Sequence, residues 1–424
     1  MRAILLLLLA ASIARAADRP PNIVLIFADD VGREVLGCYG GSSYKTPNID
    51  ALAESGTRFT HCYSMPVCHP SRVTILTGRY PTTLGNPKWG DFPKTDQNLT
   101  FAALLRQAGY ATAVAGKWQL ALLKNNPDHP QELGFDESSV FGWHEGPRFH
   151  EPMIYENGTL REDTAGTYGP DLYVDFLGDF MEKNRERPFL VWYSMALCHD
   201  VTDDIGKPVP FYKDNKWMDY GEMAESMDVM VGRIVKAIDD LDLREETLIL
   251  FTTDNGTAAS SYLGVDENGK MYKHKVMSEF GDRMVQGGKG QLTDLGTRVP
   301  LIASWPGKIE TGHAWGDLID FSDFLPTLVE IAGAELPKDV ALNGKSFAPR
   351  LLGTGAGTRP WVFSEHRGKA WTRNHRFKLY DDGRFFHMED DPDEKSALAI
   401  GDLNESARQA HAMLSKARKG IRKP

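Results

Sequence analysis

Short runs of apolar, β-prone residues alternate with helical patterns, and this alternation constrains the fold more than any other feature. Continuous apolar runs cover residues 22–28 (NIVLIFA), 188–196 (PFLVWYSMA) and 248–252 (LILFT). A strand that is apolar throughout is typical of a parallel sheet, because helices then cover both faces of that sheet. The sequence therefore predicts an α/β fold with a large, mostly parallel sheet flanked by helices.

Two helical patterns lie between these runs. The first covers residues 100–108 and leads through Gly109 to a short strand at 111–115. The second ends just before the run at 248–252, and its apolar residues recur at helical spacing: Met223, Met227, Met230, Val231, Ile234, Val235, Ile238 and Leu241. We interpret these methionines as core residues and not as a cofactor-binding motif. In a parallel sheet, ligand sites lie beyond the carboxyl ends of the strands.

The first residues, MRAILLLLLAASIARA, place one arginine before a short apolar run that ends in Ala-Arg-Ala. This pattern predicts that residues 1–16 are a secretory signal peptide, because the run is too short to span a bilayer. We therefore expect a secreted or periplasmic protein without a stable membrane anchor.

The remaining chain divides into two predicted units. Residues 17–335 carry the alternating pattern and are predicted to form the N-terminal α/β catalytic domain. Residues 336–424 are predicted to form a smaller C-terminal α+β subdomain. It begins with a stretch rich in proline and glycine, followed by short strands at 361–364, 377–380 and 384–388 and a basic helix at 403–419.

Charge and cysteine content exclude several classes of protein. The formal net charge of -10 argues against nucleic-acid or anionic-membrane binding, so an anionic substrate would need local cations. The four cysteines, Cys38, Cys62, Cys68 and Cys198, are too few for a disulfide scaffold. A bridge between Cys38 and Cys62 stays open as an alternative.

Acidic and amide side chains follow two of the predicted strands directly. Asp29 and Asp30 end the run at 22–28, and Asp254 and Asn255 follow the run at 248–252. Adjacent carboxylates repel each other unless a cation lies between them or the pair is a solvated turn. Oxygen donors without histidine favour Ca²⁺ or Mg²⁺ over zinc, and Ca²⁺ is preferred because it tolerates irregular coordination.

A helix is predicted after Cys68. Pro70 suits its first turn and Gly78 its end, so Cys68 would lie at the helix N-terminus, which favours an anion. An ordinary buried cysteine is the alternative. The segment 68–79 (CHPSRVTILTGR) resembles the type I sulfatase family of the alkaline-phosphatase-like superfamily. It matches all eight fixed positions of that family's signature, C-x-P-S-R-x-x-x-L-T-G-R.

The resemblance implies a sulfuric ester hydrolase whose Cys68 is converted to Cα-formylglycine. A formylglycine-generating or sulfatase-maturing enzyme would be its partner, and Ca²⁺ would be held by Asp29, Asp30, Asp254 and Asn255 together with position 68. Three further residues resemble family landmarks, although an isolated lysine or histidine is by default a surface or core residue. Lys117 lies in a Gly-Lys-Trp element and Lys289 lies in GGKG, and both resemble the family's lysines that contact the sulfate group. His199 lies in LCHD and resembles the family's histidine that faces the leaving-group oxygen.

One position departs from the family pattern. The family usually has histidine two residues after the first lysine, where this chain has Gln119. Glutamine forms hydrogen bonds but accepts no proton near neutral pH. The substitution leaves open which group deprotonates the formylglycine hydroxyl.

The mechanism implied by the resemblance begins with hydration of the aldehyde at position 68 to a geminal diol. One hydroxyl binds the metal and attacks sulfur, while Lys117, Lys289 and Arg72 neutralise the sulfate oxygens and His199 protonates the leaving alcohol. Loss of the proton of the second hydroxyl then ejects sulfate and regenerates the aldehyde. Exported proteins meet extracellular sulfated carbohydrates, which are therefore the expected substrates, with a sulfated small molecule as the alternative.

Two rival functions stay open. One is a phosphate-ester or phosphonate hydrolase of the same superfamily. The other is a weakly catalytic protein that binds sulfated glycans, for which Gln119 is the support. Six further residues lie in segments that could rim a pocket, with an ordinary surface position as the alternative for each: His144, Glu145, Arg148, His150, His366 and Arg373.

Overall fold

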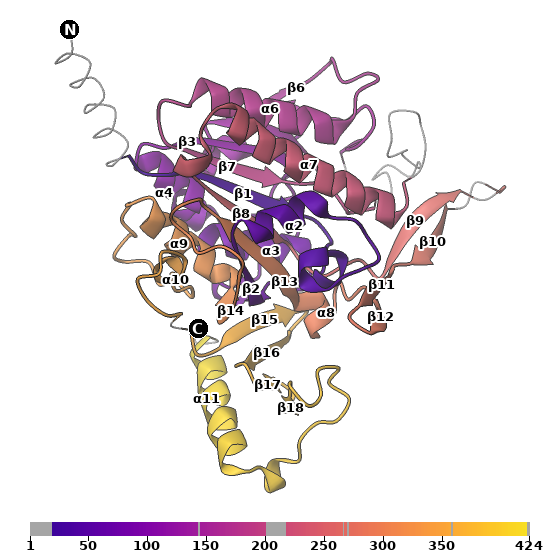
Figure 1. Cartoon of the computed structure of the whole chain (residues 1–424), viewed down its shortest axis with the longest axis vertical. Helices are drawn as coiled ribbons and strands as arrows, with labels where there is room; N and C mark the ends of the chain where they lie inside the picture. Colours follow the sequence, from indigo (N-terminus) through magenta and orange to yellow (C-terminus); the bar gives the residue numbers. More distant parts are fainter. Residues whose placement is uncertain are drawn as a thin grey trace.

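The computed structural model describes residues 19–142, 145–200, 218–265, 267–268, 271–357 and 359–421. The predicted signal peptide lies outside these residues. A ten-stranded sheet forms the centre, with the strand order β14-β2-β13-β8-β1-β7-β3-β4-β5-β6 (Figure 1). Its strands are β1 (Asn22–Ala28), β2 (Thr57–Tyr63), β3 (Ala111–Lys117), β4 (Glu137–Phe141), β5 (Tyr155–Glu156), β6 (Thr159–Leu160), β7 (Phe189–Ser194), β8 (Thr247–Thr253), β13 (Arg298–Ser304) and β14 (His313–Asp320).

The central strands are parallel, as the sequence predicted. β1 pairs in parallel with β7 and β8, and β3 pairs in parallel with β7 and β4. Every residue of β1, β7 and β8 is buried, which explains their unbroken apolar sequences. β13 departs from this direction, because it runs antiparallel to both β8 and β2. The parallel strands bring the carboxyl ends of β1, β3, β7 and β8 to one edge of the sheet.

Helices cover both faces of the sheet (Figure 1). Side chains alternate along a strand, so Val24 and Ile26 face one layer while Leu25 and Phe27 face the other. The first layer contains α2 (Pro47–Glu54), α6 (Gly169–Lys183) and α7 (Tyr220–Asp240). The second contains α3 (Cys68–Thr77), α4 (Phe101–Gln107) and α9 (Phe324–Ile331).

The methionine-rich pattern is confirmed as a core helix. Met223, Met227 and Met230 are buried on α7 and pack against the first face of the sheet. Two positions differ from the prediction. Val235 is only partly buried, and Leu241 follows the end of α7.

A four-stranded antiparallel sheet and a helix form the C-terminal α+β unit. Its strands are β15 (Val362–His366), β16 (Lys369–Arg373), β17 (Phe377–Tyr380) and β18 (Phe385–His387), and its helix is α11 (Glu405–Ile421). Apolar residues of α11, including Leu414, pack against Phe377 and Leu379. The sequence did not predict β16, whose residues KAWTR combine two cations with buried apolar positions. Tyr63 and Val362 belong to one hydrophobic cluster that joins this unit to the main sheet.

The described residues also form two antiparallel strand pairs and three short α-helices: β9 (Ser260–Val265) with β10 (Met271–Lys275), β11 (Met277–Phe280) with β12 (Arg283–Gln286), α5 (His129–Glu132), α8 (Asp294–Thr297) and α10 (Ala348–Leu351). The segment after β12 carries the predicted site residue Lys289. All four cysteines are free thiols, so the Cys38 to Cys62 bridge left open above is not formed.

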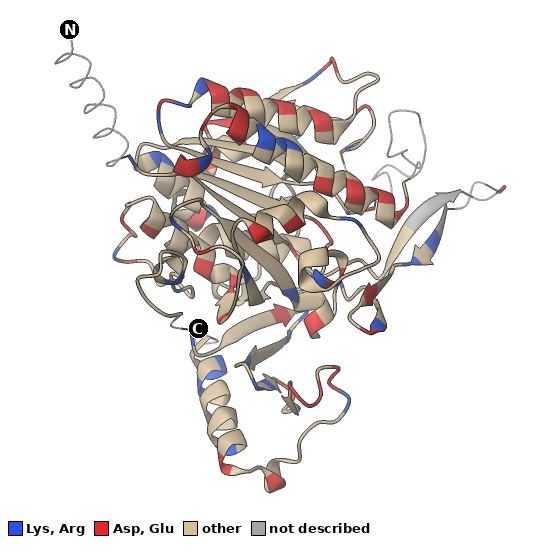
Figure 2. Cartoon of the chain, viewed as in Figure 1, with Lys and Arg blue, Asp and Glu red and all other residues tan. Residues whose placement is uncertain are grey.

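Acidic residues predominate on the outer helices. Figure 2 shows them along α6 and α7, where Asp171, Asp175, Asp179 and Glu182 occupy one helix. This surface accounts for part of the negative net charge, and the cations of the candidate site lie elsewhere. In the part of the chain that the structure describes, no helix is both long enough and apolar enough to cross a bilayer.

Candidate active site

The two acidic segments converge at the carboxyl ends of β1 and β8. The two strands pair in parallel with Ala28 opposite Thr253, so the residues that follow them lie side by side. Asn255 Nδ2 donates a 2.8 Å hydrogen bond to Asp30 Oδ1. Asp29, Asp30, Asp254 and Asn255 are all fully buried. The predicted convergence of the two segments is confirmed.

Cys68 lies beside these carboxylates. It is the first residue of α3, whose end is set by Gly78 in the left-handed conformation, as the sequence predicted. Ligand atoms of Asp29, Asp30, Cys68 and Asp254 all lie within 4.8 Å of one another. A helix N-terminus, a thiol and three carboxylates thus share one small volume.

Three cations surround this acidic group. Lys117, the last residue of β3, contacts Asp29 Oδ2, and Lys289 Nζ lies 2.6 Å from Asp30 Oδ2. Arg72, on the first turns of α3, places its guanidinium 3.6 Å from Asp254 Oδ2 and donates to the Lys117 carbonyl oxygen. The three formal positive charges balance the three carboxylates.

The neighbours of the carboxylates shift their pKa values in opposite directions. Burial alone would raise the pKa of Asp29, but the charges of Lys117 and Arg72 act against it, and the pKa lies below its ordinary value. Burial raises the pKa of Asp30 and of Asp254, and the charge of Asp29 adds to both shifts. A divalent cation among these groups would relieve the repulsion.

Three buried oxygens that lack a hydrogen bond in the described part of the chain indicate where such a cation fits. Among the described residues, Asp29 Oδ1, Asp254 Oδ2 and Asn255 Oδ1 are buried and have no hydrogen-bond partner. Buried polar atoms are normally satisfied, so three orphaned oxygens at one place need an explanation. Hard oxygen donors of this kind suit Ca²⁺. Because the existing charges cancel, the ion would leave the site positive toward an anionic substrate.

The Cys68 thiol is a poor nucleophile as it stands. Burial raises its pKa to about 12, although Lys117 and Lys289 act in the opposite direction. The thiolate is the reactive form of cysteine, and at neutral pH this side chain stays protonated. An oxidised side chain at this position would not depend on that ionisation.

His199 follows β7 and faces the same group. Its Nε2 lies 3.9 Å from Asp30 Oδ2, and its Nδ1 is 2.5 Å from the Asp200 carbonyl oxygen. A carbonyl oxygen only accepts, so Nδ1 carries the hydrogen of the neutral ring. Burial, with the charges of Lys289 and Lys117, lowers the pKa of His199 well below its ordinary value.

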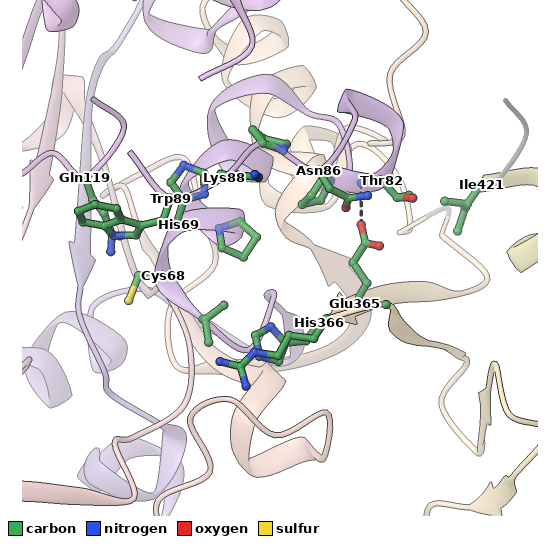
Figure 3. Close-up of a pocket in the computed structure, with 16 residues that line it drawn as sticks. Cys68, His69, Thr82, Asn86, Lys88, Trp89, Gln119, Glu365, His366 and Ile421 are labelled. Atoms are coloured by element: carbon green, nitrogen blue, oxygen red, sulfur yellow. Dashed lines mark hydrogen bonds between the residues drawn. The ribbon is translucent and has the colours of Figure 1, made fainter. Parts of the chain in front are cut away.

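Gln119 lies two residues beyond Lys117 in an unusual conformation. Its φ is +62°, and its side chain is buried, with Oε1 unpaired among the residues that the structure describes. Gln119 and Cys68 line the same cavity (Figure 3). The strained backbone therefore places an unsatisfied amide oxygen at the wall that also carries the candidate nucleophile.

The cavity beside Cys68 has a volume of about 1010 Å³. The start of α3 forms its inner end, a loop at 86–89 one wall, and the segment 365–368 of the C-terminal sheet another (Figure 3). Sequence reasoning missed Lys88, Trp89 and Arg367 because loop and turn positions carry no periodic signal.

The six residues that could rim the pocket lie in different parts of the structure. His366 lines the cavity, and the charge of Arg148 acts on the pKa of His199. Three others are not among the residues that line this cavity and make other contacts: Glu145 accepts from the Leu123 and Lys124 backbone amides, His150 lies near Glu151, and Arg373 bonds Asp294. His144 lies outside the described residues.

Comparison with known proteins identifies the family. A family model described as Sulfatase matches residues 21–334. The chain belongs to the sulfatase family. It is thus an enzyme that hydrolyses sulfate esters. A second model, described as N-sulphoglucosamine sulphohydrolase, C-terminal, matches residues 289–407 of this sulfatase.

Individual relatives agree with this assignment. The sulfatase is 34% identical to arylsulfatase A of Homo sapiens, over 88% of this chain and 77% of the relative. It is 30% identical to N-acetylgalactosamine-6-sulfatase of Canis lupus familiaris, over 84% of this chain and 71% of the relative. The crystal structure of Ps i-CgsB superimposes with a TM-score of 0.75 at 25% identity, covering 95% of this sulfatase and 92% of that chain.

Proposed function

We propose that this sulfatase releases sulfate from a sulfated carbohydrate, using formylglycine formed from Cys68 and a Ca²⁺ ion held by Asp29, Asp30, Asp254 and Asn255. The observation that carries the proposal is the set of three orphaned, buried oxygens beside Cys68. Mg²⁺ is the alternative ion. Support for a sugar substrate comes from the name of the canine relative, which specifies a sulfated amino sugar.

Each group has a distinct task in this scheme. The bound ion supplies Lewis-acid activation of the sulfate group, and the hydrated aldehyde supplies the hydroxyl nucleophile. Lys117, Lys289 and Arg72 hold the sulfate oxygens. In the structure these cations contact carboxylates. With an ion held by the carboxylates, Lys117, Lys289 and Arg72 would be available to the substrate.

His199 is the proposed proton donor to the leaving alcohol. Its depressed pKa makes the ring neutral before substrate arrives. An anionic sulfate ester beside the ring favours the imidazolium and so raises that pKa. Proton donation is then coupled to substrate binding.

Gln119 orients the hydroxyl at position 68 without taking its proton. The orphaned Oε1 accepts a hydrogen bond from that hydroxyl. Because an amide is not a base near neutral pH, the rate of proton removal is expected to limit turnover.

The proposal includes export and maturation. The pattern of residues 1–16 supports secretion or a periplasmic location, and the complete signature at 68–79 supports a formylglycine-generating or sulfatase-maturing partner.

Mass spectrometry of the peptide that contains residue 68, paired with sulfate release from defined saccharides, tests the proposal. We expect the aldehyde mass and sulfate release in the same preparation. An active preparation with only free thiol would refute the formylglycine assignment. Faster turnover of 4-nitrophenyl phosphate than of the sulfate analogue would support the phosphate-ester alternative. Tight glycan binding without sulfate release would support the glycan-binding alternative.

A further inference from the structure

The turn between β15 and β16 carries an arginine where hairpin geometry disfavours one. His366 pairs with Lys369, so Arg367 and Gly368 form a two-residue turn. Both have positive φ, +49° and +77°. Such turns favour Asn-Gly or Asp-Gly, because the left-handed conformation is costly for other side chains. Hairpin stability therefore does not explain why position 367 is an arginine.

This turn lies between two cavities. His366 and Arg367 line the cavity beside Cys68 and also a second cavity of about 450 Å³. The second cavity has Lys369 on its wall, and its acidic residues are already paired: Asp393 with Arg283 and Glu394 with Lys378. Arg367 therefore lies where two cavities meet, beyond the sulfate-binding end of the first.

The opposite wall supplies a second cation and an aromatic ring. Lys88 is exposed, and Trp89 is 39% exposed, which is unusual for so large an apolar side chain. Figure 3 shows both on the other side of the cavity from His366. An indole face suits the apolar C–H face of a sugar ring.

The side chains that line this cavity carry a net positive charge, whereas the whole protein carries a net negative charge. Its fixed cations are Lys88 and Arg367, and its one carboxylate, Glu365, accepts a hydrogen bond from the Thr82 amide. Across the described part of the chain, neither Lys88 nor Arg367 has an ion-pair partner. A local positive wall in a chain of net charge -10 attracts anions to this place.

We propose that this wall binds a second anionic group on the leaving-group side of the substrate, through Arg367 and Lys88, with a sugar ring against Trp89. The substrate class is thus a polyanionic saccharide of at least two sugar units. The inference rests on the proposed function, because the first sulfate must be bound at position 68. The second group is a sulfate or a carboxylate, since a guanidinium binds either through paired N–H donors.

The test compares disaccharides that differ only in the second group. Formylglycine-containing protein is assayed for sulfate release from a monosulfated neutral disaccharide, from its disulfated analogue and from its uronate-containing analogue. Arg367→Asn removes the cation while asparagine tolerates the left-handed backbone. Lys88→Gln removes the facing cation, and Lys236→Gln on α7 is a control for loss of an exposed lysine.

We expect wild-type kcat/KM to be higher for the dianionic disaccharides. Arg367→Asn should reduce the ratio of dianionic to monoanionic kcat/KM about tenfold, mainly through KM, because a charge-assisted contact is lost. Lys88→Gln should change the ratio in the same direction and Lys236→Gln should not change it. The dianionic disaccharide whose kcat/KM falls most in Arg367→Asn identifies the second group as a sulfate or as a carboxylate.

An unchanged ratio in both Arg367→Asn and Lys88→Gln would overturn this inference alone. Wild-type protein that hydrolyses 4-nitrophenyl sulfate but no disaccharide would instead overturn the proposed carbohydrate function, and this inference with it.

Discussion

The backbone amide of Asp30 donates a 3.1 Å hydrogen bond to Asp254 Oδ1, across 224 residues of sequence. This contact uses one oxygen of Asp254 and leaves Oδ2 without a hydrogen bond among the described residues. The same carboxylate thus joins β1 to β8 through Oδ1 and keeps Oδ2, 3.6 Å from the Arg72 guanidinium, without a hydrogen bond to any described residue.

Replacing Asp254 by asparagine separates these two roles. Asp254→Asn keeps an oxygen for the Asp30 amide but removes the charge, so metal affinity should fall at least about 100-fold. Wild-type protein should gain about 2.7 kcal/mol of unfolding free energy at a Ca²⁺ concentration near 100 Kd, and the variant should gain much less. Thermal unfolding with and without Ca²⁺ measures the difference, and Asp382→Asn on the surface is the control. An equal Ca²⁺ response in both proteins would contradict the proposed site.

Removing the side chain at position 68 should abolish hydrolysis without unfolding the protein. Cys68→Ala deletes one small buried group, and the expected loss of stability is about 1 kcal/mol. Sulfate release should fall at least about 1000-fold, because the nucleophile is absent. Circular dichroism checks that the fold is retained, and turnover of 4-nitrophenyl sulfate checks that activity is lost. Cys62→Ala, at another buried cysteine, should retain activity. Turnover in Cys68→Ala that falls by much less than about 1000-fold would refute the assigned nucleophile.

Histidine at position 119 should introduce a titrating group beside the nucleophile. Histidine tolerates the positive φ of Gln119 better than most residues, so Gln119→His should fold. We expect kcat to gain a pH dependence below the ordinary imidazole value of about 6.5, because burial at this position disfavours the charged ring. Turnover should be faster above that pH, because a neutral imidazole accepts the hydroxyl proton. Gln119→Asn also suits this backbone and cannot titrate, so its profile should keep the wild-type shape. Identical pH profiles for the histidine and asparagine variants would show that position 119 takes no part in proton transfer.

The stability of the second core layer should fall in acid because of His129. Its Nδ1 accepts a 3.0 Å hydrogen bond from Trp118 Nε1, and burial lowers its pKa to about 4. In the unfolded chain the ordinary pKa is about 6.5. Between these values only the unfolded state binds the proton, so the free energy of unfolding should decrease as pH falls from about 6.5 to about 4.

Urea unfolding at several pH values measures this slope. His129→Gln should reduce it, whereas His313→Gln, at an exposed site, should leave it unchanged. A slope that is the same in all three proteins would mean that His129 is protonated in the folded state.

The sequence predicted those parts of the fold and site that are encoded locally. The apolar run at 22–28 and the aspartates after it are contiguous, so strand and ligands could be placed together. The direction of β13 could not be predicted, because RVPLIAS has the same apolar character in either direction. Arg367 and Trp89 were missed because their position depends on how the C-terminal sheet packs near α3, which is a tertiary property.

Nearly every residue of α3 is buried, and Cys68 itself is only 5% exposed. The proposed oxidation of this thiol needs access to it, and the folded structure buries both the thiol and the helix that follows it. The proposed maturation of Cys68 is therefore expected to act before α3 is buried. Without the proposed maturing enzyme, a preparation would contain folded molecules that lack the aldehyde and have no activity.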